Sequence, residues 1–167
     1  MPNDLQRDPQ RDPRTADFDF LIGRWAVHHR RLKERLIGCT EWEEFAGHSE
    51  LRTLMDGRVN VDDNVIELPG RTYRAVTLRS FDPGSKQWAI WWLDGRDPHR
   101  IDTPMIGSFS DGVGSFYADE VVQGQPVRVR FLWTHITPTS CRWQQAFSTD
   151  PGLNWETNWV MDFKRAD

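Results

Sequence analysis

Turn-forming residues interrupt this chain at such short intervals that long helices have little room. Segments of about ten residues between such signals are typical of an all-β sandwich or barrel, because each segment is long enough for one strand only. In the Asp-Pro-Gly triplets, Pro and Gly suit the second and third positions of a tight reversal. The signals are Asp56-Gly57, Pro69-Gly70, Asp82-Pro83-Gly84, Asp94-Gly95, Asp111-Gly112, Gly124-Gln125-Pro126, Pro138 to Ser140, and Asp150-Pro151-Gly152.

Between the turns, apolar and polar residues alternate with period two, as in strands that present two different faces. We expect roughly nine or ten antiparallel strands connected as a meander. Three consecutive strands share a face rich in aromatic rings. Its members are Val127, Val129, Phe131, Trp133 and His135, then Trp143, Gln145 and Phe147, then Trp155, Thr157, Trp159, Met161 and Phe163.

A sheet of that many strands exposes its edges unless it closes. The predicted fold class is therefore all-β, an antiparallel up-and-down barrel of about 8–10 strands, whose interior is filled by side chains or holds one small ligand. Nine Trp and nine Phe accompany only two Tyr. So many large apolar rings must be buried, since they would otherwise leave adhesive patches on the surface.

The 167 residues suit one domain. Residues 1–16 contain Arg7-Asp8-Pro9 and its near copy Arg11-Asp12-Pro13 with hardly an apolar side chain, so we expect a disordered N-terminal tail. The barrel domain is expected at 17–167, and Asp17 to Gly23 reads as a short helical turn capped by Asp17.

Charge and hydropathy exclude several partners. The formal net charge is -4, and no patch of Lys and Arg is present to neutralise phosphates, so nucleic acid is not expected. The longest apolar run, Trp88 to Leu93, is far too short to span a membrane. Because the N-terminus has no apolar segment, we expect a cytoplasmic location. Cys39 and Cys141 are expected to be free thiols, too few for a disulfide scaffold or a zinc site.

No sequence motif indicates a metal or a cofactor. The five His residues are scattered, and His48 with Glu50 is the one close pair on the second strand. Asp62-Asp63-Asn64 resembles part of a calcium loop but lacks the other ligands, so we interpret it as a hairpin turn. His135 is a candidate axial haem ligand. The prediction is nevertheless no metal and no cofactor, and the motifs of hydrolases, P-loops and dinucleotide-binding folds are absent.

One motif resembles a known family. The segment Phe18-Asp19-Phe20-Leu21-Ile22-Gly23-Arg24-Trp25 carries a Gly-x-Trp at the entry to the first long strand. This motif is similar to the signature of lipocalin-like, or calycin, barrels. The resemblance implies that Trp25 lies across the closed end of the barrel with a basic residue from the last strand, Arg165 or Lys164, packed on its ring. Gly23, Trp25 and Arg165 are thus the expected barrel-closing residues.

The second half of the chain resembles a family of uncharacterised bacterial lipocalin-like proteins. The resemblance implies a calycin barrel but carries no agreed reaction or ligand. The chain lacks the disulfides of secreted lipocalins, which argues against an extracellular carrier. The segments concerned are Gly114 to Asp119, Val127 to Trp133, Arg142 to Ser148, and Asn154 to Phe163.

Alternation suggests which side chains point inward. If Trp25 points inward, so do Val27, His29 and Arg31. His29 then either faces the lumen or lies solvated at the rim. His135 follows Trp133 on the ring-rich face, so it either shares a polar spot with Gln145 on the neighbouring strand or simply hydrogen-bonds it. The predicted ligand-binding residues are Tyr73, Trp92, Trp133, His135, Trp143, Gln145 and Trp159.

Three hypotheses for function remain open. In the first, the lumen binds a small, largely apolar molecule of aromatic or polyketide-like character. In the second, the same pocket is an isomerase, cyclase or decarboxylase, with His29 or His135 as acid–base residue and Arg31 stabilising an anion. In the third, rings fill the lumen, and the barrel acts through an apolar outer face as a homodimer. The charged segment Asp94 to Asp102 is expected at a barrel end, either at the mouth or merely solvated.

Overall fold

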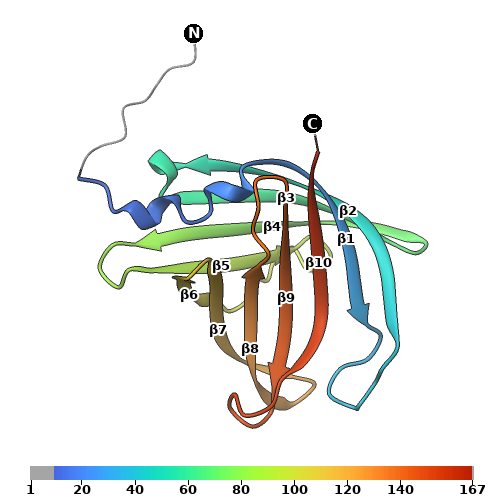
Figure 1. Ribbon diagram of the computed structural model, residues 1–167. Helices are drawn as coiled ribbons and strands as arrows, with labels where there is room; N and C mark the ends of the chain where they lie inside the picture. The colour runs from blue at the N-terminus through green and yellow to red at the C-terminus, as the bar shows by residue number, and fades with distance from the viewer. Residues whose placement is uncertain (1–9, 167) are drawn as a thin grey trace.

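The computed structural model describes residues 10–166 and shows a closed antiparallel barrel of ten strands (Figure 1). Each strand pairs with its neighbours in sequence, and β1 pairs with β10 to close the barrel, which confirms the predicted up-and-down fold class. The strands are β1 (Gly23–Leu32), β2 (Trp42–Leu54), β3 (Val59–Leu68), β4 (Arg71–Asp82), β5 (Gln87–Asp94), β6 (Met105–Ser110), β7 (Val113–Val122), β8 (Gln125–Thr134), β9 (Ser140–Ser148) and β10 (Glu156–Ala166). Three short 3₁₀ helices accompany them: η1 (Pro13–Ala16), η2 (Asp19–Leu21) and η3 (Met55–Gly57).

Strict alternation of buried and exposed residues explains why these segments form barrel strands. In β4, Tyr73, Ala75, Thr77, Arg79 and Phe81 are buried, and the residues between them are largely exposed. Period two sends every second side chain into the barrel. Tight turns of the predicted kind connect the strands, as at 82–86, where the Asp82 carboxylate accepts backbone N–H bonds at 3.0 and 3.1 Å.

The strands cross in two groups, because a barrel of this kind is strongly twisted. In Figure 1, β8, β9 and β10 stand upright, whereas β3, β4 and β5 run across them. The end of the barrel where β1 begins and β10 ends carries η1 and η2. The opposite end, toward the bottom of Figure 1, carries the loops β1–β2, β7–β8 and β9–β10. We call these the closed end and the open end.

Aromatic rings fill the closed end. The Phe18 ring lies 5.0 Å from both Trp88 and Phe109 and 5.8 Å from Phe116, measured between ring centroids. The contacts with Trp88 and Phe109 are edge to face, and such contacts add to the free energy of simple burial. The Trp88 indole N–H also donates to the Asp17 carboxylate at 3.2 Å. One end of the barrel is therefore a packed core, as the third hypothesis expected for the whole lumen.

Three local expectations are corrected by the structure. The expected tail does not extend to residue 16, because Pro13–Ala16 form η1 and Thr15 is buried with its hydroxyl bonded to Arg11; residues 1–9 lie outside the described part. Asp17 does not cap the turn at η2, which begins at Asp19 without a side-chain cap. Residues 62–64 are not a turn but the middle of β3, since β2 and β4 flank them on both sides.

No helix in the described residues is long and apolar enough to cross a membrane. Cys39 and Cys141 are both free thiols, and burial raises the pKa of Cys141 to about 12.

Candidate functional site

The floor of the barrel is closed by Gly23, Trp25 and Arg165. The Arg165 guanidinium lies 4.2 Å from the Trp25 ring centroid and donates to the backbone carbonyls of Ile22 and Phe20 at 2.6 and 2.9 Å. Gly23 has a φ of +109°, and a Cβ there would come within 2.9 Å of Arg165 Nη1. The glycine is thus required twice, by its backbone conformation and by the arginine beside it.

Above the filled end lies an inner cavity of about 100 Å³ with indole walls. Trp92, Trp133, Trp143 and Trp159 line it, and the Trp159 ring meets Trp143 at 5.5 Å and Trp92 at 6.3 Å, edge to face in both cases. Gln145 lines the same cavity and donates to Asn158 Oδ1 at 2.8 Å. The structure therefore brings together five of the seven predicted ligand-binding residues.

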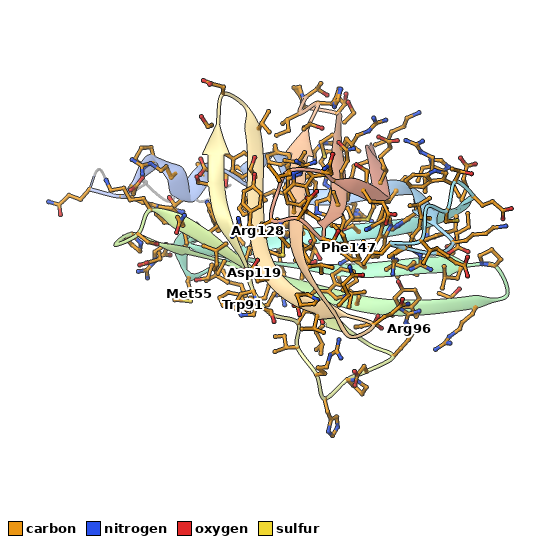
Figure 2. The ribbon with its side chains drawn as sticks, turned by 90° about the horizontal axis from the view of Figure 1, so that it is seen from below. Met55, Trp91, Arg96, Asp119, Arg128 and Phe147 are labelled. Carbon is orange, nitrogen blue, oxygen red and sulfur yellow. The ribbon has the colours of Figure 1, made fainter. Side chains whose placement is uncertain are left out.

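An outer cavity of about 320 Å³ continues toward the open end and shares Trp92, Trp159 and Gln145 with the inner one. It reaches the protein surface next to β5 and β6, which pair only over 88–90 and 105–107 before the chain between them departs. Figure 2 views the molecule from this side, with Arg96 just after β5 and Phe147 in β9 labelled. Both of these residues line the outer cavity.

Four arginines and two acidic residues line the outer cavity: Arg31, Arg35, Arg96 and Arg100, with Asp102 and Glu120. Two of the arginines, Arg31 and Arg96, form close ion pairs with carboxylates of the protein. Arg31 forms a 2.9 Å ion pair with Glu43 and lies 5.4 Å from the Trp159 ring. Arg96 pairs with Asp94 at 2.7 Å. Its guanidinium covers the Tyr73 ring at 3.7 Å.

Arg35 differs from these, because its Nε is buried without a hydrogen-bond acceptor. Burial and the nearby charge of Arg31 lower the pKa of Arg35. The charge of Glu156 raises the pKa of Arg35, but both oxygens of the Glu156 carboxylate accept a hydrogen bond from the Leu36 N–H. A buried donor without an acceptor is costly, so this position is suited to an anion supplied from outside the chain.

Between the two ends lies a buried ion pair that the sequence analysis missed. Arg79 and Asp62 are 4% and 6% exposed in their side chains and meet at 2.8 Å. The Thr77 N–H donates to the Asp62 carboxylate at 3.1 Å, Asn64 donates to it as well, and Arg79 also donates to Asn60 at 3.0 Å. Asp62 and Arg79 line the inner cavity, which gives the indole-walled space one polar side.

Alternation alone could have found this pair. Arg79 has the parity of the buried Tyr73, Ala75, Thr77 and Phe81 on β4, and Asp62 has the parity of Asn60 and Ile66 on β3. The turn-like composition of residues 62–64 hid the strand.

His29 is buried, as an inward position on β1 requires, but it does not line either cavity. Its Nδ1 accepts the Trp159 indole N–H at 3.1 Å, and its ring stacks on Phe45 at 4.7 Å. Burial, and secondarily the charge of Arg31, lowers the pKa of His29 to about 3. The imidazole is therefore neutral at physiological pH and fixes the orientation of a wall of the cavity.

The expectation for His135 was wrong. β8 ends at Thr134, and His135 follows with a φ of +52°, so the alternation that placed it inward is broken. Its exposed ring bonds the Thr134 hydroxyl at 2.9 Å near the closed end. Neither a shared polar spot with Gln145 nor an acid–base or haem-ligating role in the lumen is compatible with that position. Tyr73 is buried beneath Arg96 and does not line the cavities either.

Asp102 is the remaining titratable group at the junction, where it lines both cavities. Burial raises its pKa, and Arg100 opposes that effect. Within residues 10–166, no group of three or more His, Cys, Asp or Glu side chains is arranged to hold a metal ion.

Comparisons with known proteins show the fold. No family model and no curated protein sequence matches this chain. Among solved structures, an S-type phycobiliprotein lyase from Guillardia theta superposes with a TM-score of 0.62 over 91% of this chain and 92% of its own, at 10% sequence identity. This chain thus has a calycin, or lipocalin-like, barrel fold.

Proposed function

We propose that this protein binds a small, flat, largely apolar molecule that carries an anionic group. The ring system lies between the indoles of the inner cavity, and the anion reaches the arginines of the outer cavity. The observation that carries the proposal is the buried, acceptor-free Nε of Arg35, at the entrance to a space walled by tryptophan.

The dimensions and chemistry support one ligand of moderate size. Binding sites for small molecules usually have volumes of roughly 300–1,000 Å³ and apolar walls with a few polar groups. The outer cavity, of about 320 Å³, lies at the lower limit of that range, and the adjoining inner cavity of about 100 Å³ adds to it. Indoles stack on flat rings, and a guanidinium binds carboxylates and sulfonates by charge-assisted hydrogen bonds. The fold shared with a phycobiliprotein lyase also fits small-molecule binding in the barrel.

A matched pair of fluorescent probes tests the proposal. Anilinonaphthalene sulfonate and phenylnaphthylamine share their ring systems, but the amine lacks the sulfonate. We expect the sulfonate to bind at one saturable site and more tightly than the amine. Arg35→Gln should weaken sulfonate binding by roughly tenfold, because one charge-assisted bond is lost, and should leave amine binding nearly unchanged.

Arg128→Gln is the matched control, since Arg128 is an exposed arginine on the outer wall, paired with Asp119 at 3.2 Å (Figure 2). It should bind both probes as the unmodified protein does. Absence of saturable binding, or equal affinities for Arg35→Gln and the unmodified protein, would contradict the proposal.

Other expectations from the sequence stay predictions. These are membership of an uncharacterised bacterial family, a cytoplasmic location and a homodimer. Sedimentation velocity at several protein concentrations tests the homodimer. The enzyme hypothesis loses its two histidines, since His135 lies outside the lumen and His29 is occupied by Trp159.

A further inference from the structure

The inner cavity holds two donors with no protein acceptor. Arg79 Nε and Trp133 Nε1 are both buried and make no hydrogen bond within the described residues. Arg79 is 3% exposed and Trp133 is 2% exposed, and both residues line the same cavity. The Arg79 guanidinium carbon lies 5.8 Å from the Trp133 ring centroid, so the two side chains are neighbours on the cavity wall.

Two unpaired donors beside one cavity call for an acceptor, because each costs about 1–3 kcal/mol when it is left unsatisfied. The Asp62 carboxylate beside the cavity receives bonds from Thr77, Asn64 and Arg79 Nη1, but from neither Arg79 Nε nor Trp133 Nε1. The missing acceptor therefore enters with whatever occupies the cavity.

The charge of the site selects the kind of acceptor. Asp62 already neutralises Arg79, at 2.8 Å. A carboxylate of the ligand would add a second negative charge close to Asp62 in a space that admits little water, which is unfavourable. A neutral carbonyl oxygen accepts two hydrogen bonds without that penalty.

We propose that the inner cavity recognises a neutral carbonyl group, as in a ketone, quinone, lactam or amide, through Arg79 Nε and Trp133 Nε1. This inference rests on the proposed function and sharpens it. The ligand carries a carbonyl at its inner end and an anion at its outer end.

Two rod-shaped probes test the inference: a biphenyl carboxylate with an acetyl group at the far para position, and the same molecule with isopropyl in place of acetyl. The two have similar shape and equal charge and differ in the carbonyl. We expect the acetyl probe to bind roughly tenfold more tightly. The infrared stretching band of its carbonyl should shift to lower frequency on binding.

Two substitutions assign the preference to its donors. Trp133→Phe keeps a ring and removes an N–H that bonds nothing in the protein, so the fold should be retained. Arg79→Lys keeps the charge opposite Asp62 and removes Nε. Each should reduce the preference for the acetyl probe to about threefold or less. Trp143→Phe removes an indole from the same cavity. It should weaken the binding of both probes equally and leave the ratio of their affinities unchanged.

The outcomes separate the two proposals. Equal binding of both probes to the unmodified protein, with no infrared shift, would show that the donors serve bound water only and would overturn this inference while leaving the proposed function standing. An undiminished preference in both Trp133→Phe and Arg79→Lys would also overturn it. Failure of both probes to bind would overturn the proposed function and this inference with it.

Discussion

The two ends of this barrel use the same residue types for opposite purposes. At the closed end, the Phe18 ring packs against Trp88 and Phe116, and none of these three residues lines the inner or the outer cavity. Toward the open end, Trp143 and Trp159 stand edge to face around free space. The difference lies in what surrounds the rings. At one end, Leu21 of η2 and Phe18, which directly precedes η2, pack into the core, whereas arginines on strand ends and loops line the cavity at the other end.

This contrast teaches that aromatic content alone does not decide whether a lumen is filled. A ring that meets other rings on all sides contributes to stability, whereas a ring with one free face contributes to binding. Substitutions at the two ends should therefore separate stability from binding.

The largest expected effect is that of Phe116→Ala at the closed end. Phe116 is 0% exposed, and the cavity left by its ring should cost about 4 kcal/mol of the free energy of unfolding. Phe131→Ala is the matched change at the open end, where Phe131 lines both cavities and is only partly buried. Urea denaturation should show a loss below about 2 kcal/mol for it. Phe131→Ala should lose probe binding, whereas the folded fraction of Phe116→Ala should keep it. The reverse pattern would contradict the assignment of stability to the closed end and of binding to the open end.

The Asp62–Arg79 pair lies at the boundary between the two ends and should give the next largest effect. Asp62→Leu or Arg79→Met alone leaves one buried charge unpaired and should cost about 3 kcal/mol. The double variant should lose less than the sum of the two, because no charge remains. A double-mutant cycle measures the coupling free energy, and the exposed pair Asp119–Arg128 is the control, for which about 0–1 kcal/mol is expected. Equal coupling free energies for Asp62–Arg79 and Asp119–Arg128 would contradict the view that the Asp62–Arg79 pair is shielded from solvent.

Acid should lower the free energy of unfolding through His29, which holds a wall of the inner cavity. The pKa of His29 is lowered to about 3 in the folded protein, against about 6.5 when unfolded, so the unfolded state binds more protons between these values. Stability from this residue is therefore present above pH 6.5 and is lost as the pH falls, by about 2 kcal/mol between pH 7 and pH 5. His29→Gln keeps an acceptor for Trp159 and should flatten the curve. His28→Gln, on the exposed face of the same strand, should not.

The smallest effect is expected for Arg96→Gln. Its ion pair with Asp94 and its contact with the Tyr73 ring lie at the rim, where solvent screens them, so the loss of stability should stay below about 1 kcal/mol. Sulfonate probe binding should weaken less than in Arg35→Gln, since Asp94 already neutralises Arg96. A larger loss than in Arg35→Gln would move the anion site from Arg35 to Arg96.

Much of the fold could be predicted, because it depends on local signals. Turn residues and period-two alternation give strands such as β4 and β9 directly, and the same parity places Trp143, Gln145 and Trp159 on the inner side. His135 was misplaced because a single residue with positive φ ends the alternation, and composition does not reveal it. Arg35 could not be found by parity at all, since it lies in a loop whose path is set by tertiary contacts.

The indoles around the cavity also have an optical consequence. Trp92, Trp143 and Trp159 have ring centroids 5.5–6.3 Å apart along the series, close enough for excitation to pass from one ring to the next before emission. A molecule bound among them that absorbs in the near ultraviolet would draw excitation from all three rings together. The emission of this protein is therefore a built-in gauge of whether its lumen is occupied, readable without any label.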